Sequence, residues 1–244
     1  MSGISMVRIR QETAALPGNT KNRVPLTVAE PEGRPRGGIV LLHESRSFSP
    51  SLRQFMEEFA EEGWTVAAPA LADEQSASDS GNALLQEFDA ARGWLLGEEI
   101  YPDRIGVIGF DSAGTVAALA GVERPLGAVV SVAAHGITGP VREGVSPLTE
   151  AVRRLCVPWL GIFGDEDPRT PPEEVQLLRD AAAHASAATL IVTYPGLGHR
   201  PDEGLPAEPA GDVDDVPDTA DASPSVAAVA AKQHIFEWFD SNLR

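Results

Sequence analysis

RIGVIGFDSAG, residues 104–114, joins an apolar run to a helix-forming segment through a turn of small residues. The run 104–110 is typical of a strand buried on both faces, and a helix is predicted to follow over 112–121. Asp111 stands at the junction, where the chain must turn sharply and bulky neighbours would not fit. In open α/β sheets the reactive groups lie beyond the carboxyl ends of the strands, so Asp111 is predicted at such an edge.

The alternation of strand and helix patterns extends in both directions from this unit. Strands are predicted over 6–13, 24–30, 38–42, 65–69, 104–110, 127–133, 159–164 and 189–194. Helices are predicted over 49–62, 83–96, 112–121, 172–183 and 226–243. The first two strands are separated by the turn-rich PGNTKN. This order implies βαβ units, and hence an α/β fold with a mostly parallel sheet and helices on both faces.

The chain is predicted to form a single domain over residues 1–244. No internal repeat or interdomain linker is visible, and 244 residues suffice for one substantial core. The interval between Ala134 and Pro158 is too short for a typical cap domain. Residues 201–225 are acidic and rich in Pro, Ala and Gly, so they are predicted to be a mobile loop, with an acidic binding surface as the alternative.

Charge and composition exclude several classes of partner. The formal net charge is −17, which disfavours binding to phosphate backbones or anionic lipid surfaces. Nucleic acid and membrane partners are therefore not expected, whereas a small-molecule substrate is. No apolar run approaches the roughly 18 residues of a membrane helix, and no signal peptide is recognisable, so the cytoplasm is the expected compartment.

No cofactor is expected from the sequence. Cys156 is the only cysteine, which excludes a disulfide framework, and it is predicted to be a buried structural thiol. The acidic turn GDEDP lacks the spacing of a calcium loop, and no H-x-x-x-H pair occurs, so no metal site is expected. No glycine-rich dinucleotide fingerprint follows a predicted strand.

Four polar groups stand at the ends of predicted strands. Glu44 follows 38–42, Asp111 follows 104–110, Asp167 follows 159–164, and His199 lies in a glycine-rich loop after 189–194. The last three occur in the chain order nucleophile, acid, histidine that α/β-hydrolases use. His199 is the candidate base, Asp167 the acid that orients it, and the helix after Asp111 offers N–H groups to a developing oxyanion.

The pieces GGIVLLHE, FAEEGWTVAAPAL, RIGVIGFDSAG, GIFGDEDPRTP and YPGLGH, taken in this order, resemble the dienelactone hydrolase family. The family is a compact branch of the α/β-hydrolases without a lid domain. The resemblance spans about residues 37–199 and implies an α/β-hydrolase fold with no large cap domain. It also implies hydrolysis of a small ester, lactone or related electrophile.

The resemblance assigns roles by family position. Glu44 matches the glutamate that controls protonation of the nucleophile, Asp167 the triad acid and His199 the triad base. The family elbow reads Gly-x-Cys-x-Gly-Gly, whereas here Asp111 occupies the cysteine position and Ala113 that of the next glycine. The arginines that bind the dienelactone carboxylate have no clear counterpart, which favours a neutral substrate.

The identity of the nucleophile stays open at this point. Asp111 could attack carbon, as in haloalkane dehalogenases and epoxide hydrolases, or it could only cap the following helix. Ser112 is an alternative nucleophile in Phe-Asp-Ser-Ala-Gly, although a step of one residue turns its side chain by about 100° away from His199. The rival functions are a pseudo-hydrolase that binds a small molecule, and a lyase or cyclase that uses Asp111 and His199 for proton transfer.

Overall fold

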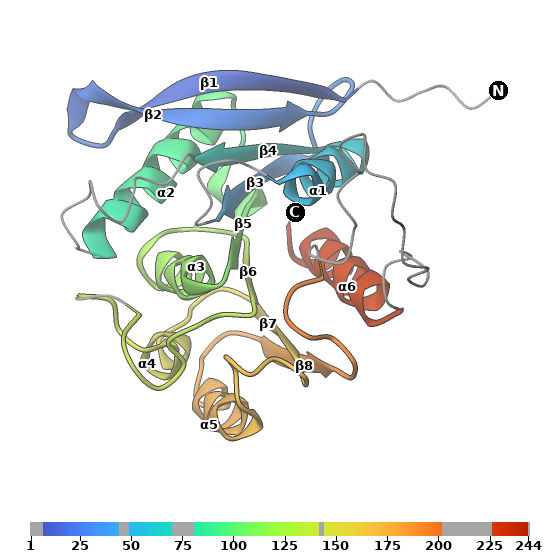
Figure 1. Ribbon diagram of the computed structural model, residues 1–244. Helices are drawn as coiled ribbons and strands as arrows, with labels where there is room; N and C mark the ends of the chain where they lie inside the picture. Colours follow the sequence, from blue (N-terminus) through green and yellow to red (C-terminus); the bar gives the residue numbers. More distant parts are fainter. Residues whose placement is uncertain (1–6, 44–48, 70–80, 142–143, 202–225, 244) are drawn as a thin grey trace, which may run out of the picture.

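The computed structural model describes residues 7–43, 49–69, 81–141, 144–201 and 226–243 (Figure 1). Within these residues, eight strands form one sheet in the order β1-β2-β4-β3-β5-β6-β7-β8. The strands are β1 (Arg8–Leu16), β2 (Asn19–Glu30), β3 (Gly37–Leu42), β4 (Trp64–Pro69), β5 (Ile105–Phe110), β6 (Ala128–Val132), β7 (Trp159–Gly164) and β8 (Thr189–Tyr194). The pairs β1–β2 and β2–β4 are antiparallel and all others are parallel.

Helices cover both faces of this sheet. One face carries α2 (Gly81–Gly97), α3 (Ser112–Glu123), α4 (Leu148–Arg153) and α5 (Pro172–Ala182), and the other carries α1 (Pro50–Glu61) and α6 (Val226–Asn242) (Figure 1). A short 3₁₀ helix, Pro102–Arg104, leads into β5. Every residue of β3, β4, β5, β6 and β7 is buried, because helices shield both of their faces. The predicted mostly parallel α/β architecture is confirmed.

The hairpin at the start of the sheet is tighter than the sequence predicted. Leu16 pairs with Asn19, so only Pro17 and Gly18 form the loop, and most of PGNTKN belongs to β2. Gly18 has φ 73°, a conformation that the second central residue of a Pro-Gly type II turn requires and that glycine adopts without strain. The position of one glycine therefore sets the location of the turn, although several other residues of PGNTKN also favour turns.

The segment before β7 also differs from expectation. The six-residue helix α4 was not predicted, since its three buried side chains are too few to show helical periodicity. Cys156 is exposed, and the prediction of a buried thiol is wrong. The strand starts only at Trp159, and Leu155 rather than Cys156 anchors this connection in the core.

Between β6 and β7 the described residues contain only α4 and its loops, so no cap domain is inserted there. Across the described part of the chain, no helix combines the length and apolarity needed to cross a membrane.

Candidate active site

The candidate site is built around the turn between β5 and α3. β5 ends at Phe110 and α3 begins at Ser112, so Asp111 makes the turn alone, with φ 54° and ψ −130°. A positive φ at a non-glycine residue costs on the order of 1–3 kcal/mol. The Asp111 N–H donates to the carbonyl of Val132 (3.1 Å), and the Asp111 carbonyl accepts from the N–H of Gly114 (3.0 Å). These bonds hold a strained elbow that projects the Asp111 side chain beyond the sheet.

Two glycines make this elbow possible. A Cβ atom on Gly109 would lie 2.2 Å from the carbonyl oxygen of Ala113. A Cβ atom on Gly114 would lie 2.9 Å from the Cβ of Ala134. Ala113 itself is buried and packs into the core between the sheet and the layer of α2 to α5. Small residues are therefore needed around Asp111 because α3 lies in direct contact with β5 and with the segment after β6.

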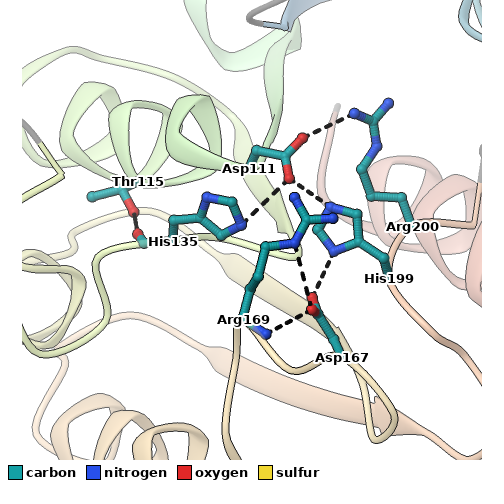
Figure 2. A network of polar contacts seen from close by, with 7 residues as sticks. All are labelled: Asp111, Thr115, His135, Asp167, Arg169, His199 and Arg200. Carbon is teal, nitrogen blue, oxygen red and sulfur yellow. Dashed lines mark hydrogen bonds and ion pairs between the residues drawn. The ribbon is translucent and has the colours of Figure 1, made fainter.

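The structure brings Asp111, Asp167 and His199 together. His199 Nε2 lies 2.7 Å from Asp111 Oδ1, and His199 Nδ1 lies 2.6 Å from Asp167 Oδ2 (Figure 2). The side chain of Asp167 is fully buried and also accepts a hydrogen bond from the backbone N–H of Arg169 (2.9 Å). The three side chains come from the loops after β5, β7 and β8. Asp167 orients the imidazole, and the imidazole faces the elbow.

Arg200 completes the surroundings of Asp111, and sequence reasoning missed it. Its Nη1 lies 2.9 Å from Asp111 Oδ2, and its guanidinium carbon lies 4.7 Å from the centre of the Phe110 ring. The Arg200 side chain is only 5% exposed. A signal was present, since Arg200 directly follows the candidate base in the glycine-rich loop. The two oxygens of Asp111 thus contact two different cationic or ionisable groups.

These contacts decide against the helix-cap interpretation of Asp111. Asp111 occupies the N-cap position of α3, but its side chain makes no capping hydrogen bond. Its oxygens bind His199 and Arg200 instead. Ser112 lies in the first turn of α3, and among the described residues no hydrogen bond joins it to His199. Of the two candidates, Asp111 is the one in hydrogen-bond contact with His199.

Electrostatics keep Asp111 ionised. Burial opposes ionisation of this carboxyl group, but the hydrogen bond from His199 and the charge of Arg200 outweigh it and lower the pKa of Asp111 from 3.8 to about 2. Burial likewise opposes protonation of His199, but its hydrogen bonds to Asp111 and Asp167 outweigh burial and raise the pKa of His199 above 6.5. Both shifts favour the pairing of a carboxylate with an imidazolium, and the two titrations are coupled.

A second histidine, His135, belongs to the site and was also missed. It follows β6, and its Nε2 lies 3.5 Å from Asp111 Oδ1. The rings of His135 and His199 are stacked, with centres 6.0 Å apart (Figure 2). His135 lines an open depression of about 520 Å³ together with Ser112, residues 136–141, Arg169 and Glu174. The sequence signal was its place just after the predicted strand 127–133.

One group of three potential metal ligands occurs among the described residues, namely Asp111, His135 and His199, with ligand atoms within 4.8 Å of one another. Two ligand atoms on a tetrahedral zinc ion would be separated by about 3.3 Å. Asp111 Oδ1 and His199 Nε2 are 2.7 Å apart, and Arg200 adds positive charge to the same carboxylate. The geometry fits a hydrogen-bonded acid–base network better than a metal centre.

Two predictions fall on residues outside those that the structure describes. Glu44 lies in 44–48, and all of the acidic segment 201–225 except Pro201 lies in 202–225. Their assignments therefore stay predictions.

Comparison with protein families gives one match that covers most of the chain. The model of the dienelactone hydrolase family matches residues 24–242. A Yersinia pestis protein provisionally named as a carboxymethylenebutenolidase is 23% identical over 198 residues, which are 73% of this chain and 74% of that protein.

Solved structures show the same fold. A provisionally named dienelactone hydrolase from Klebsiella pneumoniae superposes with a TM-score of 0.76 at 19% identity, covering 96% of this chain and 99% of that one. The dienelactone hydrolase of Anabaena variabilis gives a TM-score of 0.69 at 19% identity, with 98% and 99% covered. At these identities the likeness concerns the fold.

Proposed function

This chain belongs to the dienelactone hydrolase family, and we propose that it hydrolyses a small neutral ester, lactone or related electrophile with Asp111 as the nucleophile. The observation that carries the proposal is the strained elbow at Asp111, with φ 54° and no capping hydrogen bond. A helix cap needs no such strain. A nucleophile does, because the elbow presents one side chain to both substrate and base.

In the first step, Asp111 Oδ1 attacks a saturated carbon of the substrate and forms an aspartyl ester. The bond between that carbon and the leaving oxygen breaks, and the leaving oxygen takes the electron pair. A carboxylate suits this attack, whereas attack on an acyl carbon would give an energetic anhydride. The low pKa of Asp111 keeps the nucleophile ionised, and Arg200 holds its other oxygen in place.

The second step follows from what the ester does to His199. Esterification neutralises Asp111 and removes one of the two carboxylates that raise the pKa of His199. His199 then loses its proton to solvent and becomes a base, still oriented by Asp167. It takes a proton from water, and the hydroxide attacks Cγ of Asp111. The Cγ–Oδ1 bond breaks, and Oδ1 leaves with the product as an alkoxide that takes the second proton of the attacking water. The product is then an alcohol, Asp111 is again a carboxylate, and His199 is again protonated.

A single-turnover reaction in heavy-oxygen water tests this mechanism. With enzyme in excess over β-butyrolactone, one atom of ¹⁸O should appear in the peptide that contains Asp111, and the new hydroxyl of the product should be unlabelled. Asp111→Asn should incorporate no label. Label in the product alone would mean that water attacks the substrate directly, which would refute Asp111 as nucleophile. Absence of turnover across a panel of small lactones and esters would favour the pseudo-hydrolase.

A further inference from the structure

His135 lies in the site but takes no part in the two steps described above. Its backbone N–H donates to the carbonyl oxygen of Asp111 (3.2 Å), and its own carbonyl accepts a hydrogen bond from Thr115 Oγ1 in α3. β6 ends at Val132, and the next residue, Ala133, has φ 47° although it is not a glycine. The backbone of His135 is therefore hydrogen-bonded to the elbow and to α3. The strained residue Ala133 turns the chain toward the elbow.

The imidazole of His135 is also unusual in what it contacts. Its Nε2 is shielded from bulk water and has no hydrogen-bond partner among the described residues. Asp111 Oδ1 lies 3.5 Å from it, which is longer than a hydrogen bond. A polar atom left in this state normally has a role or a missing partner. The space beside Asp111 Oδ1 is where a substrate would bind during attack.

The two histidines face this space differently. His199 is 9% exposed, and both of its nitrogens already contact carboxylates. His135 is 25% exposed and lines the depression beside the elbow. Asp167 therefore holds the His199 ring in place, and His199 acts later as the base that activates water. His135 instead has a nitrogen, Nε2, that faces Asp111 Oδ1 without a hydrogen-bond partner among the described residues, so it can donate to a leaving oxygen released beside Asp111.

From this arrangement we infer that the site also opens small neutral epoxides, with His135 as the proton donor to the leaving oxygen. The inference rests on the proposed aspartyl-ester mechanism. Asp111 Oδ1 bonds to one ring carbon, the C–O bond at that carbon breaks, and the oxygen takes a proton from Nε2 of His135. His135 then regains a proton from solvent, balancing the one that His199 releases. Hydrolysis of the ester gives a diol.

A proton donor matters for an epoxide and much less for a lactone. A lactone opened at its saturated carbon releases a carboxylate, which is stable without a proton at neutral pH. An epoxide releases an alkoxide, a strong base that requires protonation as the bond breaks. General acid catalysis by a positioned side chain contributes about 10²–10⁴-fold to such a step. The two ring types therefore separate the role of His135 from that of Asp111.

The test compares 1,2-epoxybutane with β-butyrolactone, which both have four carbons and no charge. Aspartyl-ester formation is followed by intact mass in single turnovers of the parent, of His135→Gln and of His184→Gln, an exposed control. The parent should open both rings. His135→Gln should lose about 100-fold or more with the epoxide and remain within about threefold of the parent with the lactone. His184→Gln should match the parent.

The outcomes separate the two proposals. A parent that forms the ester with the lactone but never opens the epoxide would overturn the epoxide inference and leave the proposed function intact. Equal losses on both rings in His135→Gln would reduce His135 to a positioning role and also overturn the inference. An ester with neither ring would refute Asp111 as nucleophile and the inference with it. If His135→Gln does not fold, the parent in D₂O replaces it, with a normal solvent isotope effect expected for the epoxide only.

Discussion

The contacts of Asp111 should make folding stability depend on pH in a way that Asp111→Asn removes. The pKa of Asp111 is about 2 in the folded protein and 3.8 without its partners. A depressed carboxyl pKa contributes stability above the unfolded value, and this stability is lost as pH falls through the folded value. The difference amounts to about 2.4 kcal/mol at 1.36 kcal/mol per pKa unit, of which about 1 kcal/mol is lost between pH 5.5 and pH 3.

His199 acts in the opposite direction because its pKa is raised. Its contribution is fully present below 6.5 and is lost as pH rises through its folded value. Both shifts describe largely the same ion pair, so their free energies are not added. The pair should stabilise the fold most between about pH 4 and 6.5. Asparagine has the same shape and cannot ionise, so Asp111→Asn should flatten the acid limb. It should only weaken the alkaline limb, because Asp167 still raises the pKa of His199.

Urea unfolding at pH 3, 5.5 and 8 measures this directly. The free-energy gap between the parent and Asp111→Asn should be widest at pH 5.5 and about 1 kcal/mol smaller at pH 3. Asp240→Asn, which removes one partner of an exposed surface ion pair with Arg36, is the matched control and should change by less than about 0.5 kcal/mol. A gap for Asp111→Asn that is constant across the three pH values would refute the assignment of these shifts.

Three further variants probe the elbow and the base. His199→Gln should trap the aspartyl ester, because the first step needs no base, and intact mass should rise by one whole lactone; a variant without this adduct would contradict the order of the steps. Asp111→Cys should react with an activated aryl ester at least about tenfold faster than the parent, since a thiolate at the start of α3 beside Arg200 is stabilised; an inert but folded protein would contradict this. Gly109→Ala should cost about 1–3 kcal/mol in thermal unfolding, because its Cβ would meet the Ala113 carbonyl, while Gly93→Ala, with open space around it, should not destabilise.

The order of strands and helices could be predicted from the sequence because long apolar periodicities carry it. The predicted bounds of β7 and β8 agree with the structure at both ends of each strand. Asp111, Asp167 and His199 could be chosen as candidates because reactive groups lie beyond the carboxyl ends of strands. Elements without periodicity were harder. The helix α4 has only three buried side chains, and the hairpin loop depends on a single glycine, Gly18.

His135 and Arg200 were not identified from the sequence, because their place in the site can be recognised only in the folded chain. His135 gains importance only because β6 lies between β5 and β7, and this neighbourhood is a property of the assembled sheet. Arg200 needed the direction of one side chain in a loop. The choice between nucleophile and helix cap for Asp111 depended on whether a hydrogen bond forms to the amides of α3. No pattern of residue types encodes that difference.

The four loops of the site follow β5, β6, β7 and β8, which are neighbours in the sheet in the same order as in the chain. Asp111 and His199 are 88 residues apart, so a ribosome that adds 5–20 residues per second exposes the elbow on the order of 5–20 s before the base. During that interval Asp111 and Asp167 have no cation from β8 and must stay hydrated. Pairing of β8 with β7 then brings His199 and Arg200 to both carboxylates at once. The site of a nascent chain is therefore complete only after β8 has joined the sheet.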